Sequence, residues 1–166
     1  LTVYGGKVTT YRQLAVESLN KLHPIFPGLS QSSSHRIPLP GAMGLSQEWS
    51  QYYYQQLNGY AWLEPQWLQR LLNTYGTRIE PLLAGCNSLQ DMGIHFGHGL
   101  FQHEVDWLIK HEWVQCAEDI LWRRSKLGLY LSEKEQFNLS NYLIQFFSGN
   151  HHSAADQFRH PFPQLQ

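Results

Sequence analysis

The sequence has few charged residues, and it lacks the features of several common functional classes. Of its 166 residues only 15% are charged, and 12 Lys and Arg against 13 Asp and Glu leave a net charge of −1. Average globular chains contain about 25% charged residues. The chain has no run of Lys or Arg and no excess of positive charge, so it does not resemble a nucleic-acid-binding protein. No apolar stretch approaches the roughly 20 residues of a membrane-spanning helix.

The cysteines and histidines do not follow the spacing of a metal site. Cys86 and Cys116 do not form a CxxC motif, so we expect free thiols in a reducing compartment. The histidines cluster in one stretch that contains His95, His98, His103 and His111. The stretch has no HExxH motif and no cysteine close by, which metal ligation of this kind would require. We therefore predict surface or helix-capping histidines and no metal site.

Aromatic residues, in contrast, are abundant, with 6 Trp, 9 Tyr and 8 Phe. A chain of this length buries roughly 70% of its unfolded surface, so it can form a core without disulfides or metals. Many aromatics with few charges predict a surface that is partly covered by something else. We expect Trp107, Trp113 and Trp122 to be core or interface anchors rather than ligand platforms. The sequence leaves the oligomeric state open, a homo-oligomer included.

The patterning divides the chain into segments, and most of it is predicted to be helical. Residues 1–26 predict a strand, a glycine turn and a helix over 9–22 that Pro24 ends. The Pro-, Gly- and Ser-rich residues 27–45 predict a linker. Residues 46–148 predict an all-α domain of about five or six helices, and residues 149–166 a disordered tail. Because the chain opens without Met inside an expected strand, we interpret it as part of a longer protein.

Two helices of the all-α domain have clear boundary signals. Pro65 at the first position and Gly76 just past the end delimit one of them. Ser132 and Glu135 form a capping box ahead of the last helix. The other expected elements are a helix capped by Ser46, a short helix over 78–84, a loop over 86–100, a segment over 103–110 that fits strand or helix, and a helix over 113–126.

The segment VYGGKVTTYR, residues 3–12, carries the main functional signal. A predicted strand leads into Gly5, Gly6 and Lys7, and a helix follows. This order directs free backbone N–H groups and the positive end of a helix dipole to one point. The glycines allow a ligand close to the backbone, and Lys7 adds a positive charge. The residues alone indicate an anion or cofactor contact, with an ordinary strand-turn-helix corner as the alternative. The P-loop pattern GxxxxGK[ST] is not matched.

Several motifs together resemble the C-terminal third of FAD-dependent glycerol-3-phosphate dehydrogenases of the aerobic, respiratory type. These motifs are YGGKVTTYR at residues 4–12, LPG at 39–41, NTYG at 73–76 and the long run from Glu104 through HEW and AEDILWRRSKLGL. The resemblance covers roughly residues 1–145. It implies that residues 46–148 are the helical cap domain of such a flavoprotein and that residues 1–26 belong to its FAD-binding domain.

The resemblance also implies a reaction, partners and site residues. The whole enzyme would oxidise sn-glycerol 3-phosphate to dihydroxyacetone phosphate, with FAD accepting the hydride and quinone the electrons. Oxygen stays open as the alternative electron acceptor, because oxygen-using relatives share the same C-terminal pattern. The enzyme would lie peripherally on the cytoplasmic side of the inner membrane, and this chain's partner would be the rest of the flavoprotein. Lys7 would lie near the substrate, where its charge could bind the phosphate. The implied flavin-contacting positions, chiefly through backbone, are Gly6, Lys7, Val8, Thr9 and Thr10.

An alternative reading is an independent all-α protein-interaction module, in which the N-terminal turn is incidental. The chain has no βαβ unit with a GxGxxG loop, which the FAD pyrophosphate would need. We therefore expect the chain alone to bind no FAD tightly and to be inactive. For Arg123 and Arg124 we predict pairing within their helix, in which Asp119 is the close partner, rather than phosphate binding.

Overall fold

The computed structural model describes residues 1–149, which form two compact units, Leu1–Gly44 and the chain from Leu45 onward. In the first unit, a 3-10 turn at Val8–Thr10 leads into helix α1, Tyr11–Leu22. This confirms the helix predicted over residues 9–22. The strand expected ahead of the glycines is not formed, since residues 1–7 have no regular secondary structure. A strand needs a neighbour for its backbone N–H and C=O groups, and no segment of the described chain pairs with these residues.

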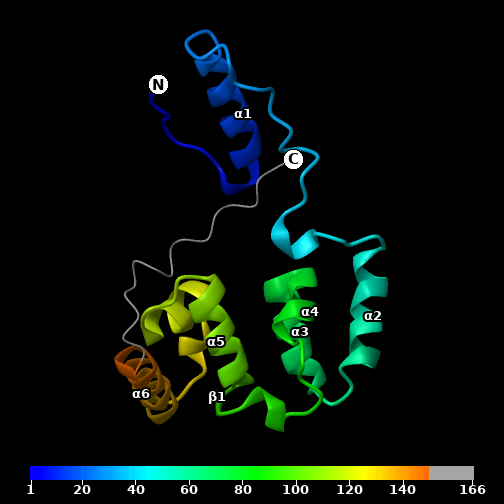
Figure 1. The fold of residues 1–166 in the computed structure, drawn as a ribbon, viewed down its shortest axis with the longest axis vertical. Coiled ribbons are helices and arrows are strands. Elements are labelled where there is room, and N and C mark those ends of the chain that lie inside the picture. The colour runs from blue at the N-terminus through cyan, green and yellow to red at the C-terminus, as the bar shows by residue number, and fades with distance from the viewer. Residues whose placement is uncertain (150–166) are drawn as a thin grey trace. The chain divides into compact units, whose positions relative to one another are not determined.

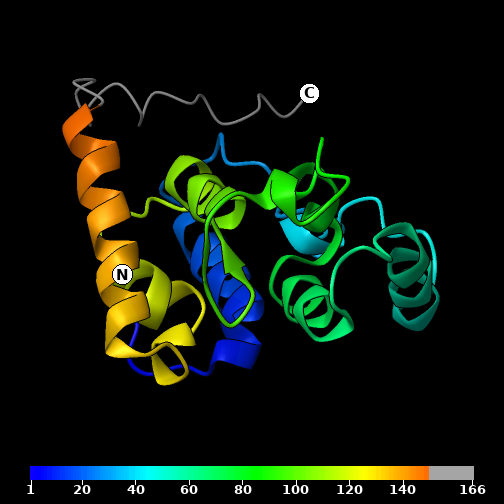
Figure 2. The same ribbon diagram turned by 90° about the horizontal axis from the view of Figure 1, so that it is seen from below.

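The second unit is almost entirely helical, as predicted. It contains α2 (Trp49–Gly59), α3 (Pro65–Tyr75), α4 (Ile79–Leu82), α5 (Gln102–His111), a π-helix (Asp119–Arg124) and α6 (Glu133–Gly149). A short antiparallel hairpin joins β1 (His95–Gly97) to β2 (Leu100–Phe101). Figures 1 and 2 both show α3 and α4 between α2 and α5, with α6 beyond α5. Short 3-10 turns lie at Pro40–Ala42 in the first unit and at Gly76–Arg78, Gln90–Met92 and Leu127–Leu129 in the second.

The two helix boundaries with clear signals are confirmed. Pro65 is the first residue of α3, and Gly76 ends the helix with a φ of 58° that favours glycine. At the start of α6 the Ser132 N–H and hydroxyl donate to the Glu135 carboxylate at 2.8 and 2.7 Å. The Glu135 N–H donates in return to the Ser132 hydroxyl at 3.4 Å. The capping box therefore forms as the sequence predicted.

Two other helices begin later than predicted. The helix expected after Ser46 begins at Trp49, and its buried residues are Tyr52 and Gln56. The helix expected from residue 113 begins at residue 117. The Asp119 carboxylate accepts the N–H groups of residues 115 and 116 at 2.9 and 3.2 Å, which caps the helix at that later point. The segment that fitted either strand or helix forms α5.

The hydrophobic core lies wholly within the second unit. Leu68 of α3, Leu108 of α5 and Leu139 of α6 are each at most 1% exposed. No helix of the first unit contains a buried residue. Within residues 1–149 no helix is both long and apolar enough to cross a membrane. The tail expected over 149–166 lies, apart from Gly149 at the end of α6, outside the described residues.

Candidate functional site

The N-terminal turn brings the predicted ligand-contacting residues together in one exposed segment. Gly5 and Gly6 have φ values of 75° and 133°, which L side chains rarely adopt. Lys7 is extended, with φ −111° and ψ 145°, and the 3-10 turn begins at the next residue. The backbone therefore reverses within a few residues, and residues 1–10 are all exposed.

The start of the helix leaves backbone donors free. Val8 and Thr9 are the first helical residues, and N–H groups at such positions have no acceptor within their helix. The Thr10 N–H and hydroxyl both donate to the Lys7 carbonyl, at 3.0 and 3.2 Å, and so hold the turn closed. The first turns of the 3-10 segment and of α1 contain no acidic residue. Their dipole and the Lys7 ammonium group therefore give this end of α1 a positive potential.

The backbone of the two glycines is uncrowded. A Cβ atom added to Gly5 would meet nothing within 4 Å, and one added to Gly6 would meet only the Leu14 side chain at 3.4 Å. The bare glycine backbone, the free N–H groups and the positive charge together suit an anionic or electron-accepting ring. That Gly6, Lys7, Val8, Thr9 and Thr10 contact a flavin stays a prediction.

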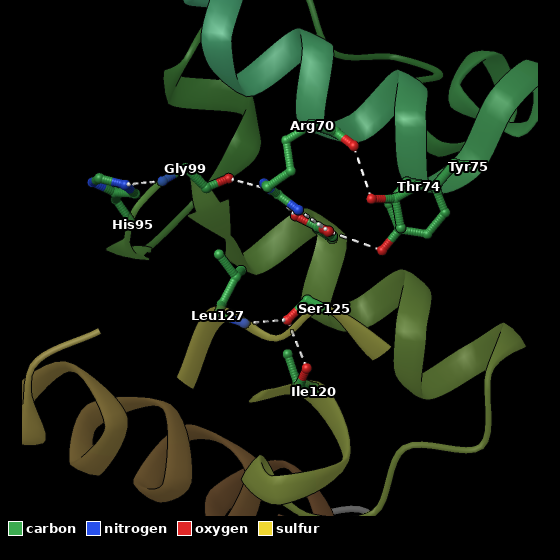
Figure 3. Close-up of polar contacts among 9 residues, drawn as sticks. Arg70, Thr74, Tyr75, His95, Gly99, Ile120, Ser125 and Leu127 are labelled. Atoms are coloured by element: carbon green, nitrogen blue, oxygen red, sulfur yellow. Dashed lines mark hydrogen bonds and ion pairs between the residues drawn. The ribbon is translucent and has the colours of Figure 1, made fainter. Parts of the chain in front are cut away.

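The second unit contains a buried ionic network that the sequence did not predict (Figure 3). Glu104 is fully buried, and its carboxylate accepts two hydrogen bonds from Arg70 at 2.8 and 2.6 Å. The Tyr75 hydroxyl donates to the same carboxylate at 2.8 Å, and Arg70 donates to the Gly99 carbonyl at 2.7 Å. Burial and the Glu104 carboxylate raise the pKa of Tyr75, so the phenol stays protonated as a donor. The network ties α3, α5 and the hairpin together.

A second charged cluster lies around Glu112. Its carboxylate pairs with Arg78 at 2.8 Å and more loosely with Arg124 at 3.7 Å. The Arg78 guanidinium group lies over the Trp107 ring, 5.2 Å from its centroid, which is a favourable cation–π position. Trp107 also packs against the core, as expected for an anchor. This cluster links the turn before α4 to α5 and the π-helix.

The remaining sequence predictions have mixed outcomes. Arg123 pairs with Asp119 one helical turn away, as predicted, whereas Arg124 reaches Glu112 on another element. Trp113 and Trp122 are 72% and 41% exposed, so their role as interface anchors stays a prediction.

The cysteines and histidines lie in separate surroundings. Cys86 is buried and Cys116 exposed, and both are free thiols. Among residues 1–149, no group of His, Cys, Asp or Glu side chains is placed to hold a metal ion. Of the histidines, His95 stacks on Phe101 with ring centroids 4.5 Å apart, and His111 lies against Trp107 at 4.0 Å.

The fold is that of a mainly helical domain preceded by an exposed glycine turn and one helix. Comparison with known families gives the particular assignment. Residues 32–148 match the C-terminal domain of alpha-glycerophosphate oxidase, and the chain belongs to this family. The family resemblance that the motifs carried is therefore confirmed.

The chain is also similar to the C-terminal part of several dehydrogenases. It is 50% identical over 143 residues to glycerol-3-phosphate dehydrogenase of Pseudomonas aeruginosa, covering 86% of this chain and 28% of that protein. It is 35% identical over 146 residues to aerobic glycerol-3-phosphate dehydrogenase of Escherichia coli, covering 88% of this chain and 29% of that protein. D-erythritol 1-phosphate dehydrogenase of Brucella abortus is 35% identical over 136 residues, covering 82% of this chain and 27% of that protein. The chain thus spans less than a third of the length of these relatives.

Proposed function

We propose that this chain serves as the C-terminal part of an FAD-dependent dehydrogenase that oxidises sn-glycerol 3-phosphate to dihydroxyacetone phosphate and passes electrons to quinone. The observation that carries this proposal is the uncovered turn at Gly5–Thr10. Its glycines, free N–H groups and lysine suit a flavin and a phosphate, yet nothing in its own unit covers it. The family membership of residues 32–148 supports the glycerol phosphate part of this proposal independently of the turn.

In this proposal each residue of the turn has a distinct task. FAD, when bound, supplies the oxidant that accepts the hydride from the carbinol carbon of the substrate. The N–H groups of Val8 and Thr9 and the positive end of α1 stabilise negative charge on the bound ring. Gly5 and Gly6 allow the backbone to approach it, and the Thr10 bonds to the Lys7 carbonyl keep the turn in shape.

Lys7 is proposed to bind the phosphate of the substrate. The named substrates of the relatives, glycerol 3-phosphate and D-erythritol 1-phosphate, are both phosphate esters of small polyols. An exposed ammonium group with no acidic residue in the adjoining helical turns suits a phosphate dianion. Among these polyol phosphates we infer the glycerol ester, because the relative that is 50% identical carries its name, whereas the D-erythritol 1-phosphate dehydrogenase is 35% identical.

We further propose that the turn is complete only beside the flavin-binding part of a longer protein. That part would supply the loop for the FAD pyrophosphate, the second half of the substrate pocket and the strands that residues 1–7 lack. The 166 residues alone would then bind FAD weakly and be inactive. The whole protein would associate with the cytoplasmic side of the inner membrane as a peripheral protein.

The test is an assay of the complete protein that contains these residues, with FAD bound. We expect reduction of a quinone analogue that depends on glycerol 3-phosphate and is much slower with D-erythritol 1-phosphate. A flavin-loaded protein that oxidises neither substrate would overturn the proposed reaction. Faster turnover of the erythritol ester would replace the proposed substrate.

The role of Lys7 is tested by Lys7→Ala, with Lys21→Ala at the other end of α1 as the control. Loss of a charged hydrogen bond to the phosphate should lower kcat/KM by roughly 10- to 100-fold, chiefly through KM. Lys21 is exposed in the last turn of α1, far along the helix from the glycines, so its variant should behave as wild type. Equal kinetics for both variants would overturn the proposed role of Lys7 in substrate binding, but not the proposed reaction.

The alternative of an independent interaction module rests on exposed aromatic side chains of the second unit. Trp113, Tyr130 and Phe137 are 72%, 62% and 65% exposed. The two proposals differ in what the N-terminal turn does. An interaction module predicts that Gly6→Val in the complete protein leaves flavin content unchanged, whereas the dehydrogenase proposal predicts its loss.

A further inference from the structure

The tip of the hairpin β1–β2 has an unusual backbone that must be held in place. Gly97, His98 and Gly99 have consecutive positive φ values of 117°, 46° and 73°. The pairing of the two strands is irregular between His95 and Gly97. A non-glycine residue in this conformation costs free energy, so the surrounding contacts must fix it.

Side chains from two helices hold this tip. Arg70 of α3 donates to the Gly99 carbonyl at 2.7 Å. A Cβ atom on Gly99 would lie 2.5 Å from the Trp67 ring of α3, so the backbone lies directly against that ring. On the other side, the Glu135 carboxyl carbon of α6 would lie 2.6 Å from a Cβ atom on Gly97. Both glycines are buried by these contacts.

The Gly99 N–H donates to His95 Nε2 at 3.1 Å (Figure 3). A nitrogen that accepts a hydrogen bond carries no proton, so the His95 ring is neutral with its proton on Nδ1. His95 itself is exposed to solvent, whereas Gly99 is buried. The acceptor can therefore exchange protons with water, while the donor that depends on it cannot readily find a water partner.

We propose that His95 is a pH-sensitive switch. It keeps the hairpin tip packed against α3 only while the imidazole ring is neutral. When Nε2 takes up a proton from solvent, both ring nitrogens become donors and the bond from the Gly99 N–H breaks. The buried amide is then left without an acceptor, which costs more than the bond itself contributed. The tip opens to let water reach it, and the Arg70 bond to the Gly99 carbonyl weakens with it.

Charged and aromatic groups from α3, β2 and α6 lie around His95. Glu135 of α6 is the charged group near His95 and His98, and its pKa lies below the usual value because Ser132 donates to it. The rings of Phe101 and Trp67 lie 4.5 and 5.3 Å from the His95 ring and accommodate a cation. Arg70 is already engaged by the buried carboxylate of α5 and faces the Gly99 carbonyl.

The first test uses the full 166-residue chain and NMR between pH 5 and 8. The ¹⁵N shifts of the His95 ring should show an unprotonated Nε2 at pH 8. As the ring takes up its proton, the Gly99 amide signal should move with the same midpoint. Its exchange rate, corrected for the intrinsic pH dependence, should rise about 10-fold, as expected for the loss of one buried hydrogen bond. A protonated Nε2 at pH 8, or a Gly99 amide signal that does not shift as His95 is protonated, would overturn the proposal.

The second test compares His95→Gln with His98→Gln as the matched control. Glutamine can accept the Gly99 N–H and does not titrate, so the pH step at Gly99 should vanish in His95→Gln. His98 is exposed at the tip and is not the acceptor of the Gly99 N–H, so its variant should keep the step. If the pH-dependent change at Gly99 persists in His95→Gln, or disappears in His98→Gln, the proposed switch is wrong. If His95→Gln fails to fold, the ring shifts of the unaltered chain decide the question.

Discussion

The two units of the chain bury their apolar side chains in opposite ways. Every buried hydrophobic residue lies at or after Tyr52, in the second unit. In the first unit Tyr4 and Val8 are 91% and 90% exposed, and Ile25 and Phe26 are more than half exposed. A segment that exposes so much apolar surface is built to be covered by another surface. The second unit, in contrast, has the core of an independent domain.

The polar contacts of the two units differ in the same way. Within the first unit, all of whose residues the structure describes, every side-chain hydrogen bond joins residues at most four positions apart. In the second unit, Arg70 and Glu104 are 34 positions apart and Tyr142 and Asp106 are 36 apart. The first unit is thus held by local bonds alone, whereas long-range bonds tie the helices of the second together. The predictions below test this difference, beginning with the largest expected effect.

The largest loss of stability should come from Glu104→Ala. The substitution leaves Arg70 and the Tyr75 hydroxyl without their buried acceptor, which costs about 3–5 kcal/mol for a broken buried pair. Urea unfolding followed by circular dichroism measures the change. Glu118→Ala removes an exposed carboxylate and should stay within about 0.5 kcal/mol of wild type. Equal losses from both substitutions would show that the network contributes nothing specific.

Core truncation should separate the two units directly. Leu68→Ala in α3 removes a fully buried side chain and should lower the free energy of unfolding by about 2–5 kcal/mol. Tyr11→Ala in α1 removes a larger side chain that is half exposed. This substitution should change the free energy of unfolding by no more than about 0.5 kcal/mol. The same urea experiment measures both. A comparable loss from Tyr11→Ala would mean that the first unit has a core of its own.

A smaller effect is expected at the start of α6, and it depends on pH. Hydrogen bonds from Ser132 lower the pKa of Glu135 below its usual value of 4.5. A carboxylate whose pKa is lowered in the folded state stabilises the folded state at pH values above the usual pKa. This stabilisation is lost as the pH falls through the lowered pKa of the folded state. Glu135→Gln keeps a capping side chain but cannot titrate. Between pH 5 and 3 the wild type should therefore lose more stability than this variant. Parallel pH profiles from thermal unfolding would contradict the capping role.

The smallest effect should follow removal of the whole first unit. Residues 45–166 contain the entire core, so their free energy of unfolding should match that of the full chain within about 1 kcal/mol. Thermal unfolding of the two chains measures the difference. A large drop in the midpoint temperature would show that residues 1–44 stabilise the helical unit.

The sequence predicted those elements whose signals are local. Pro65 and Gly76 delimit α3, and Ser132 with Glu135 starts α6, because each signal acts within one turn of its own helix. The turn at Gly5–Thr10 was also predicted as one cluster, since its residues are contiguous. Its role in binding stays a prediction.

The features that were missed depend on contacts between distant segments. The hairpin tip closes because Gly99 lies against Trp67, 32 positions earlier in the sequence by their numbers, and no local pattern reveals that contact. The late start of the π-helix depends on the Asp119 carboxylate capping the residues before it. Glu104 is charged, and a charged residue is expected on the surface unless its partner is known.

The long-range polar bonds of the second unit also bear on the order in which the chain folds. The Tyr142 hydroxyl, which donates to Asp106, can find its partner only after α5 and α6 have formed and docked. Closing a large loop costs chain entropy before the contact at its ends contributes any stabilising energy. Such bonds therefore form late on the folding path. Tyr142→Phe would then speed unfolding and leave the folding rate nearly unchanged. The lifetime of the folded domain, more than the speed at which it forms, depends on these bonds.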